Sequence, residues 1–560
     1  MSFYETILSE IRTAVGVGDL ALEVPREKSF GDFSTNAAMQ LAKSEHKPPR
    51  EIAAAILPKI TALPFVESAD IAGAGFINIK IKNQFIIESV NAPSPKSLVP
   101  NPLTIDMDYG AYNVAKSLHI GHLRGSVIGD TFYRIARFLG HRPISYNHMG
   151  DWGRPMASVI AWIIRKFPGD WSRADFQINE SEFNDYYPLA AALTKTDADF
   201  LAQVLEIKRE FQDGEPRYTA LYEKMLAISM RQMHDAEARL NMLPFDNDLG
   251  ERNAAKYLPA AEKILRAKNM LSMSDGAEIV ELKRADDKAP MPPLMWLDSR
   301  GADTYDSTDI ATIYYRKITD NPDRIIYFTD YRQQLHFDMV FRTADMAGLF
   351  PSDRLEFPYF GGINGPDGRP LKTRDGAAAG LADIIGMVDD AARARNPDLP
   401  AETNKMISLA ALRFNELMHD RKSDYIFDAD DVVKFEGRTG PYILYTAVRL
   451  NSVLKKSEVV TPRRAAGPDR GAQVISITAD YERDLLLKIL EFPRAVQGAF
   501  DRRSPDILAN YTYDLCQTAN GFYHNCPVKD DPSRLAITRR AIDTLSTCID
   551  LMGMKVPDEM

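Results

Sequence analysis

The stretch that decides the fold is residues 106–124, which read DMDYGAYNVAKSLHIGHLR. An alternating apolar run from Leu103 to Tyr109 leads into a short polar loop, and apolar residues then recur at helical spacing: Leu123, Val127, Ile128, Phe132, Ile135 and Phe138. A strand, a loop and a helix in this order present a nucleotide at the strand's carboxyl end in an open α/β sheet. The helix N-terminus attracts phosphate, and Gly121 lets an adenine ring approach the backbone. This stretch therefore predicts a nucleotide-binding parallel sheet.

The rest of the chain divides into three parts. A proline-rich segment, residues 91–102, follows a first domain that has an opening helix, a loop at 26–36, two helices and a strand-like run at 73–81. Strand-like and helix-like patterns alternate from about 103 to 395, and the pattern is nearly all helical from about 405. We therefore expect domains at 1–98, 99–400 and 401–560, with a helical insertion at about 155–270 in the second.

Composition excludes several classes of protein. The chain is 45% hydrophobic and 26% charged, as in ordinary globular proteins, and no apolar run approaches the roughly 20 residues that span a bilayer. The first ten residues carry two acids and no basic segment, which argues against a secretory signal. Cys516, Cys526 and Cys548 are few and unpatterned, so we expect buried thiols, a cytoplasmic location and no metal site. The net charge of −10 does not by itself favour nucleic-acid binding.

The motif and its flanks resemble a known family. His119-Ile120-Gly121-His122 resembles the H-I-G-H motif of class I aminoacyl-tRNA synthetases, and the flanking Asn-Val-Ala-Lys and His-Leu-Arg-Gly are similar to those of arginyl-tRNA synthetases. The resemblance covers nearly the whole chain. It implies a Rossmann-like α/β parallel sheet with a helical insertion, an α+β N-terminal domain and an all-α anticodon-binding domain. It also implies ATP-dependent activation of L-arginine and its transfer to tRNA(Arg), with activation that needs bound tRNA. Mg²⁺ would arrive with ATP, without a dedicated protein site, and we expect a monomer.

The chemistry of adenylation indicates which side chains carry it. The attacking carboxylate is already an anion, so the enzyme mainly positions the reactants and neutralises charge on the leaving group. His119 and His122 suit that role as donors, and with Gly121 they form the expected ATP site. Lys372 and Arg374 in the glycine-bounded loop 365–376 can reach phosphate, although this loop resembles the family's K-M-S-K-S loop only loosely. The resemblance implies that Lys116 compensates.

A guanidinium pocket needs carboxylates, because arginine pairs with them in a bidentate manner and is never neutral. Asp108 ends the strand of the motif, and Tyr305 and Asp309 lie four apart, so a helix puts both on one face. Each residue alone is more often a surface or capping residue. Together and in this order, one set matches the positions that bind arginine in the family: Asp108, Asn113, His119, Tyr305, Asp309 and Gln333.

The C-terminal part resembles the family's anticodon-binding domain, which typically ends on methionine. Exposed tyrosines beside arginines form stacking platforms for unpaired bases. The expected contacts to the anticodon loop are Tyr442, Tyr445, Arg449, Tyr523 and Met560, and those to the tRNA elbow are Phe76 and Asn78. Tyr442 and Tyr445 are three apart, which is also core spacing, so a core aromatic stripe stays an alternative.

The chain departs from the family pattern at three places, and rival functions stay open. Gly110 and Tyr112 stand where many members have Ser and Pro, and Arg154-Pro155 replaces the usual Thr-Gln. By the family's layout Tyr112 lies beside the α-amine site, so arginine affinity is the property in question. The alternatives are a paralogue that charges tRNA for a biosynthetic, non-translational purpose, a non-catalytic tRNA-binding protein and a small-molecule nucleotidyltransferase.

Overall fold

A five-stranded parallel sheet with the strand order β12-β11-β5-β6-β7 lies at the centre of the molecule. The computed structural model describes residues 2–25, 27–92, 99–169, 171–369, 371, 380–460 and 475–560, without the side chains of residues 458–460. The strands of this sheet are β5 (Thr104–Asp108), β6 (Arg142–Met149), β7 (Asn247–Gly250), β11 (Arg324–Tyr327) and β12 (Leu355–Glu356). Their carboxyl ends share one edge, because Asp108 lies opposite both Tyr327 and Tyr146.

The helix that follows the motif, α5 (Ile120–Leu139), is buried along most of its length. Its predicted apolar face is inside the protein except at Phe138, which is 38% exposed and packs edge-on against Phe492, with ring centroids 5.6 Å apart. Gly140 ends the helix in the left-handed conformation that favours glycine. The predicted strand, loop and helix around the motif are confirmed.

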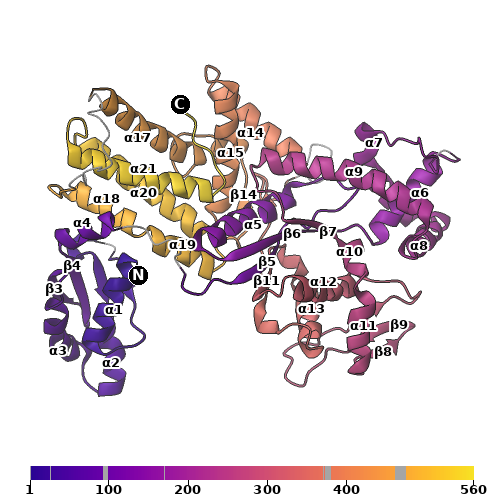
Figure 1. The fold of residues 1–560 in the computed structure, drawn as a ribbon, viewed down its shortest axis with the longest axis horizontal. Coiled ribbons are helices and arrows are strands. Elements are labelled where there is room, and N and C mark those ends of the chain that lie inside the picture. Colours follow the sequence, from indigo (N-terminus) through magenta and orange to yellow (C-terminus); the bar gives the residue numbers. More distant parts are fainter. Residues whose placement is uncertain are drawn as a thin grey trace.

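The helical insertion extends away from the sheet (Figure 1). It consists of four helices: α6 (Arg154–Lys166), α7 (Glu180–Thr196), α8 (Ala198–Gln212) and α9 (Pro216–Arg239). The sequence pattern places this insertion at about 155–270, but β7 within that range pairs with β6 and belongs to the central sheet. The run of helices that leaves the sheet therefore ends at Arg239.

The second half of the catalytic region packs beneath the sheet around its own apolar core. A three-stranded antiparallel sheet lies here, formed by β8 (Leu271–Ser274), β9 (Ala277–Val280) and β10 (Leu294–Leu297). The helices are α10 (Glu251–Ala255), α11 (Leu258–Ala267), α12 (Tyr305–Thr319) and α13 (Gln334–Met346), with the 3-10 turns η2 (Tyr331–Gln333) and η3 (Ser352–Arg354). As predicted, Tyr305 and Asp309 lie on one helix, and Gln333 follows a strand and precedes a helix.

The N-terminal domain is α+β, with a four-stranded antiparallel sheet in the order β1-β2-β4-β3. Its elements are α1 (Phe3–Val15), β1 (Leu22–Glu23), η1 (Lys28–Phe30), β2 (Phe33–Thr35), α2 (Ala37–Glu45), α3 (Pro49–Thr61), β3 (Val66–Ala72), β4 (Phe76–Ile81) and α4 (Asn83–Asn91). The stretch 26–36 was expected to be a loop. It contains β2, because Phe33 and Thr35 are buried and the strand pairs with β4.

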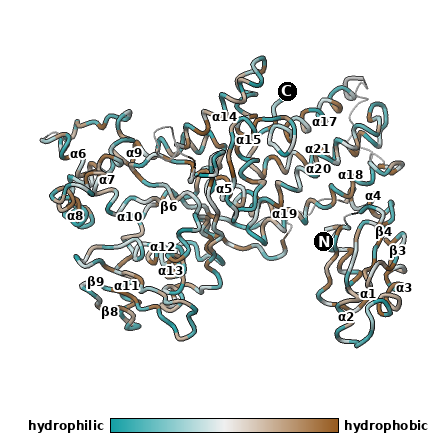
Figure 2. Tube along the Cα trace, turned by 180° about the vertical axis from the view of Figure 1, so that it is seen from behind, coloured by the Kyte–Doolittle hydropathy of each residue, from teal (hydrophilic) through white to brown (hydrophobic). Residues whose placement is uncertain are grey.

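The C-terminal part is nearly all helical, as predicted. Its elements are α14 (Leu381–Arg395), α15 (Ala401–Leu417), α16 (Ala429–Val432), α17 (Gly440–Val460), α18 (Asp480–Leu490), α19 (Phe492–Asp501), α20 (Asp506–Asn525) and α21 (Pro532–Leu551), and the short strands β13 (Ile363–Asn364) and β14 (Tyr425–Ile426) pair nearby. Hydrophobic and hydrophilic residues alternate along these helices (Figure 2), and their buried apolar residues belong to one core.

Two buried ion pairs join the motif helix α5 to α15. Arg124 Nε lies 2.7 Å from Glu416, and Arg413 Nη2 lies 2.6 Å from Asp130. All four side chains are at most 1% exposed. Removing one member of such a pair costs roughly 3–5 kcal/mol, because a buried charge is left uncompensated. The nucleotide half of the sheet is thus fixed against the helical C-terminal part.

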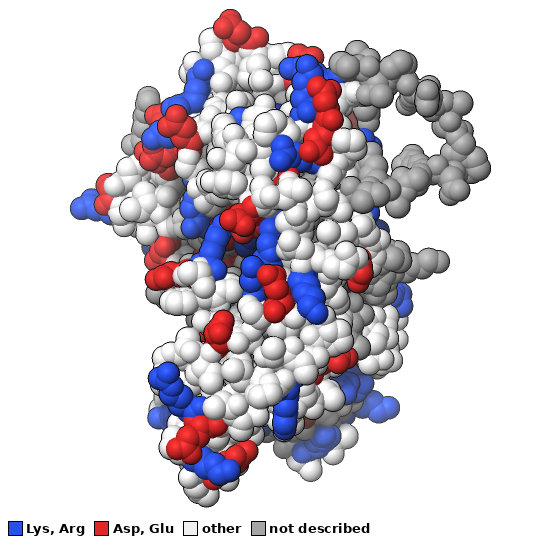
Figure 3. All heavy atoms as spheres, turned by 90° about the vertical axis from the view of Figure 1, so that its left-hand side faces the viewer, with Lys and Arg blue, Asp and Glu red and all other residues white. Residues whose placement is uncertain are grey.

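A third ion pair joins the N-terminal domain to the helical C-terminal part. Arg483 of α18 contacts Asp32 of the N-terminal domain at 2.5 and 2.8 Å and donates to the carbonyl of Ile81 at 2.6 Å. Lys28 also pairs with Asp484. On the face that Figure 3 shows, charged side chains of both signs gather where the two lobes meet. The N-terminal domain is therefore held against the helical part by specific contacts.

Two composition-based predictions can be compared with the structure. The three cysteines are free and buried, as expected. Among the described residues, no helix is both long and apolar enough to cross a membrane.

Candidate active site

Two histidines cap the N-terminus of α5 with their own side chains. His119 Nδ1 accepts a hydrogen bond from the Gly121 N–H at 3.1 Å, and His122 Nδ1 accepts one from the His119 N–H at 3.0 Å. Their ring centroids are 4.0 Å apart. Because Nδ1 is an acceptor in each ring, the ring proton of the neutral form must lie on Nε2. The pair therefore offers Nε2–H donors at a helix N-terminus.

The environment keeps both histidines neutral. Burial, and then the neighbouring His119, lower the pKa of His122 to about 3. Burial also lowers the pKa of His119, and Lys116 and Arg332 add to the effect. Neutral donors are suited to phosphate oxygens in a site that already gathers lysine and arginine nearby. They can stabilise developing negative charge by hydrogen bonding without repelling those cations.

The loop before the histidines is built from strained and close-packed backbone. Ala111 and Ala115 have φ angles of +49° and +60°, which side chains other than glycine rarely adopt. Gly110 packs so closely on the Asn147 side chain that a Cβ would collide with it. Asn113 bridges to Gly150 at the end of β6. The departure at Gly110 is therefore explained by local packing.

Asp108, at the end of β5, is paired with a buried arginine. Arg316 Nη2 of α12 lies 2.7 Å from its Oδ2, and the Arg316 guanidinium lies over the rings of Tyr146 and Tyr327 at 4.3 and 5.4 Å. Asp106 is also fully buried, and burial raises its pKa to about 8. Arg316 was missed by the sequence analysis because it lies 208 residues from Asp108.

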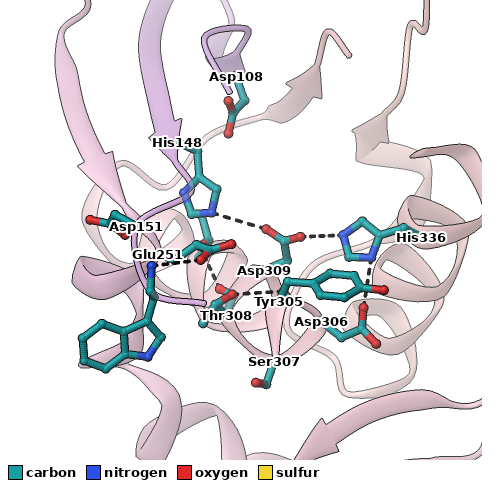
Figure 4. Close-up of polar contacts among 12 residues, drawn as sticks. Asp108, His148, Asp151, Glu251, Tyr305, Asp306, Ser307, Thr308, Asp309 and His336 are labelled. Atoms are coloured by element: carbon teal, nitrogen blue, oxygen red, sulfur yellow. Dashed lines mark hydrogen bonds and ion pairs between the residues drawn. The ribbon is translucent and has the colours of Figure 1, made fainter. Parts of the chain in front are cut away.

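Asp309 lies in a cluster of acidic and histidine side chains (Figure 4). Its Oδ2 is 2.6 Å from His336 Nε2, and its Oδ1 is 3.5 Å from His148 Nε2. Burial opposes ionisation of Asp309, but the hydrogen bond and charge of His336 outweigh it and hold the pKa below its usual value. The carboxylate is therefore ionised across the physiological range.

Two further acids at this edge were missed by the sequence analysis. Glu251, the first residue of α10, accepts a hydrogen bond from the Trp152 N–H at 3.3 Å. Burial and the charges of Asp151 and Asp309 raise the pKa of Glu251 to about 8. Burial also raises the pKa of Asp151, which accepts from the Tyr222 hydroxyl at 2.7 Å. An acid beside Asp309 whose raised pKa keeps it largely protonated can ionise when a cation binds.

The remaining predicted residues are placed as follows. The Tyr305 ring is 60% exposed and lies 5.0 Å from the His336 ring, while Gln333 is exposed one turn before His336. Lys116 lies with its Nζ 4.3 Å from the centroid of Tyr187 on α7, which is a cation–π contact. Lys372 and Arg374 lie outside the described residues.

The departure at Tyr112 is also a packing feature. Tyr112 is 1% exposed, its hydroxyl lies 2.8 Å from the Ser126 hydroxyl on α5, and its ring meets His122 edge-on. By the family's layout Tyr112 would lie beside the substrate α-amine, but its hydroxyl points into the protein. Arg154 and Pro155 begin α6, where proline suits the first turn of a helix.

Three parts of the chain match known domains. Residues 91–429 match the family described as tRNA synthetases class I (R), catalytic domain, residues 443–560 match the DALR anticodon binding domain, and residues 4–81 match the arginyl tRNA synthetase N terminal domain. The arginine–tRNA ligase of Alkaliphilus oremlandii is 36% identical over 94% of each chain, and that of Maricaulis maris is 33% identical over 99% of this chain and all of the relative. The chain belongs to the arginyl-tRNA synthetase family.

Solved structures agree on the fold. The arginyl-tRNA synthetase of Plasmodium falciparum aligns with a TM-score of 0.83 at 23% identity, over all of this chain and 98% of that one. The Thermus thermophilus enzyme aligns over the full length of both chains with a TM-score of 0.80, also at 23% identity. The predicted class I fold with its two flanking domains is confirmed.

The residues that this arginyl-tRNA synthetase family member offers for anticodon contacts differ in exposure. Tyr445 is 42% exposed and lines a cavity of about 570 Å³ together with Met560 and Phe435. Tyr442 is half-buried, and its hydroxyl accepts a hydrogen bond from Asn520 Nδ2 at 2.9 Å. The core alternative therefore describes Tyr442 better than Tyr445.

Four other residues predicted to contact tRNA also reach the surface, at two places. Arg449 lies over the Tyr523 ring at 4.1 Å, and both side chains are partly exposed. On β4, Phe76 is 37% exposed, and Asn78, two residues on, shares that face of the strand. A base can stack on an exposed ring at either place.

Proposed function

We propose that this chain is an arginine–tRNA ligase, which activates L-arginine with ATP to arginyl-adenylate and pyrophosphate and then transfers arginine to tRNA(Arg). The observation that carries the proposal is the arrangement at one edge of the parallel sheet. Neutral donors at the start of α5 stand on one side, and a cluster of carboxylates around Asp309 stands on the other. The first suits the phosphates of ATP, and the second suits a guanidinium.

The roles of individual residues follow from this arrangement. We assign His119 and His122 to the phosphates, with Gly121 beside the adenine and with Lys116, Lys372 and Arg374 as further cations. We assign Asp309, Asp108, Tyr305, Asn113 and Gln333 to arginine. Mg²⁺ would come bound to ATP.

The tRNA surfaces belong to the same proposal. The cavity beside Tyr445 and Met560 can accept a base of the anticodon loop, and Phe76 with Asn78 can meet the tRNA elbow. Ion pairs between α5 and α15, and between α18 and the N-terminal domain, connect both surfaces to the catalytic sheet. This connection supports the expectation that activation needs bound tRNA. A monomer in the cytoplasm is the state we propose.

The paralogue alternative rested mainly on the unusual Gly110 and Tyr112. Both positions are accounted for by packing, Gly110 by the closeness of Asn147 and Tyr112 by its contact with Ser126, so they give no reason to assign a different purpose. The experiment that tests the proposal is aminoacylation of total tRNA with each of the twenty amino acids. Charging with arginine alone is expected, and charging with another amino acid, or no charging, would contradict the proposal. Pyrophosphate exchange with and without tRNA tests the requirement for tRNA.

A further inference from the structure

His336 holds two carboxylates of the candidate arginine site at once. It lies in the first turn of α13, its Nδ1 is 3.0 Å from Asp306 Oδ1, and its Nε2 is 2.6 Å from Asp309 Oδ2. Asp306 and Asp309 are one turn apart on α12, so the ring bridges neighbouring acids from a different helix (Figure 4). The His336 side chain is 11% exposed, and the two carboxylates are 6% and 15% exposed.

Hydrogen bonds to two ionised carboxylates require a charged ring. Each nitrogen faces a carboxylate oxygen, and only the imidazolium carries a hydrogen on both nitrogens. Burial alone would lower the pKa of His336, but the hydrogen bonds and charges of Asp306 and Asp309 raise it to about 9. A cation in the first turn of a helix also faces the unfavourable end of the helix dipole. The two carboxylates therefore raise the pKa of His336 by more than burial and the helix dipole lower it.

Other charged groups surround the bridge. On α12, Arg316 acts on Asp309 from two turns further along, and the exposed Tyr305 ring covers His336. From β6, His148 approaches the other oxygen of Asp309 at 3.5 Å. From α10, Glu251 lies close enough for Asp309 to raise its pKa. Of these groups, only His336 forms a short hydrogen bond to the Asp309 carboxylate.

We propose that His336 is a positioning residue that keeps Asp309 ionised and fixed in orientation for the guanidinium of arginine. This inference rests on the proposed function, in which Asp309 binds that guanidinium. His336 would not touch arginine itself. It would act through Asp309, whose burial would otherwise favour the neutral acid, and a neutral acid cannot form the ion pair.

The sign of the pH effect follows from the carboxylate. In the wild type, the pKa of Asp309 lies below its usual value, so the carboxylate stays ionised from pH 6 to 8. Without the imidazolium, burial raises the pKa of Asp309, and the affinity for arginine should fall as the pH decreases. The pKa of Glu251, about 8 in the wild type, lies in the same window. The effect of His336 is therefore read from the ratio of variant to wild type at each pH.

The test is pyrophosphate exchange with arginine and saturating tRNA at pH 6, 7 and 8, using the full chain. His336→Gln should raise the KM for arginine about tenfold or more at pH 7, while kcat and the KM for ATP change less than about threefold. The ratio of arginine KM values should grow as the pH falls from 8 to 6. His234→Gln is the matched control, because His234 also pairs with an aspartate, Asp248, but is 53% exposed on α9. That control should match the wild type.

His336→Lys keeps the positive charge and serves as the second variant. Its ratio to the wild type should stay constant with pH, and it keeps the inference testable where His336→Gln does not fold. A pH-independent ratio for His336→Gln, or a fall in kcat with an unchanged arginine KM, would show a merely structural role and overturn the inference. A ratio for His336→Lys that grows as the pH falls would also overturn the inference. Failure of the proposed function is distinguishable, because the wild type itself would then not activate arginine.

Discussion

The two sides of the candidate active site are built in different ways. At the start of α5, each histidine accepts from a backbone N–H two or three residues away, and both rings stay neutral. Around Asp309, the side chains come from α10, α12, α13 and β6, and the contacts join charged groups far apart in the sequence. The first side is a local motif, while the second exists only once the chain has folded.

The difference has a chemical reason. Phosphates bring their own negative charge, and neutral N–H groups with a helix N-terminus can stabilise them with little change in the protein. A guanidinium is a permanent cation, so its site needs ionised carboxylates away from water. Buried carboxylates need compensating cations to stay ionised, and His336 and Arg316 supply them in the free protein. The arginine side therefore needs more partners than the phosphate side.

The largest expected effect is on the arginine side. Asp309→Asn should lower kcat/KM for arginine about a hundredfold to a thousandfold, because truncating one partner of a buried charge pair costs about 2–5 kcal/mol or more. Steady-state pyrophosphate exchange measures this, and the KM for ATP should change little. Asp175→Asn, at an exposed pair with Arg173, is a control that should match the wild type. A normal kcat/KM for arginine in Asp309→Asn, or activation of neutral citrulline by the wild type, would remove Asp309 from the pocket.

The next effect is on the phosphate side and should appear in kcat. His122→Ala should lower the rate of arginine activation about a hundredfold or more, as loss of a transition-state donor does. Because the pKa of His122 is about 3, its protonation should produce no change in kcat between pH 6 and 8. Single-turnover adenylate formation across this range measures both. A wild-type rate in His122→Ala would place the motif outside the reaction, and an acid limb near pH 6.5 that disappears in the variant would show that the ring titrates normally.

The same contrast between local and long-range contacts explains how much of the site the sequence predicts. The strand, the histidine pair and the helix of residues 103–139 were predictable, because the strand shows in its own apolar alternation, the histidine caps span two or three residues, and helical contacts span three or four. Asp309 and Tyr305 were predictable as a one-turn pair. His336 lies 27 residues from Asp309, and Arg316 lies 208 residues from Asp108, so only the fold brings them together. The neutral state of the histidines also needed the structure, since it depends on burial and on which nitrogen accepts.

A substitution at the tRNA surface lies outside both sides of the candidate active site, so it should affect the phosphate side and the arginine side equally. Tyr445→Ala should weaken tRNA(Arg) binding about tenfold or more, because a stacked base contributes roughly 1–3 kcal/mol. Activation should fall at limiting tRNA and recover at saturating tRNA, which separates this variant from His122→Ala. Filter binding and pyrophosphate exchange measure the two quantities. Tyr481→Ala, at a similarly exposed tyrosine on α18, should leave tRNA affinity within about twofold of the wild type.

Either of two results would change this interpretation. Unchanged tRNA affinity in Tyr445→Ala would make the tyrosine a packing residue like Tyr442. Weaker tRNA binding together with arginine activation in the absence of tRNA would retain the anticodon contact but contradict the dependence of activation on tRNA.

The smallest expected effect is at Tyr112, whose ring meets His122 edge-on. Its hydroxyl is buried against Ser126, so Tyr112→Phe should lower the free energy of unfolding by about 1 kcal/mol, the typical contribution of one hydrogen bond. The KM for arginine should stay within about twofold of the wild type. If the two hydroxyls interact only with each other, Tyr112→Phe combined with Ser126→Ala should cost less than the sum of the single changes. Denaturant unfolding of the four proteins measures this coupling. A tenfold higher KM for arginine in Tyr112→Phe would instead place the hydroxyl on the substrate, and the paralogue with an altered pocket would again be the better interpretation.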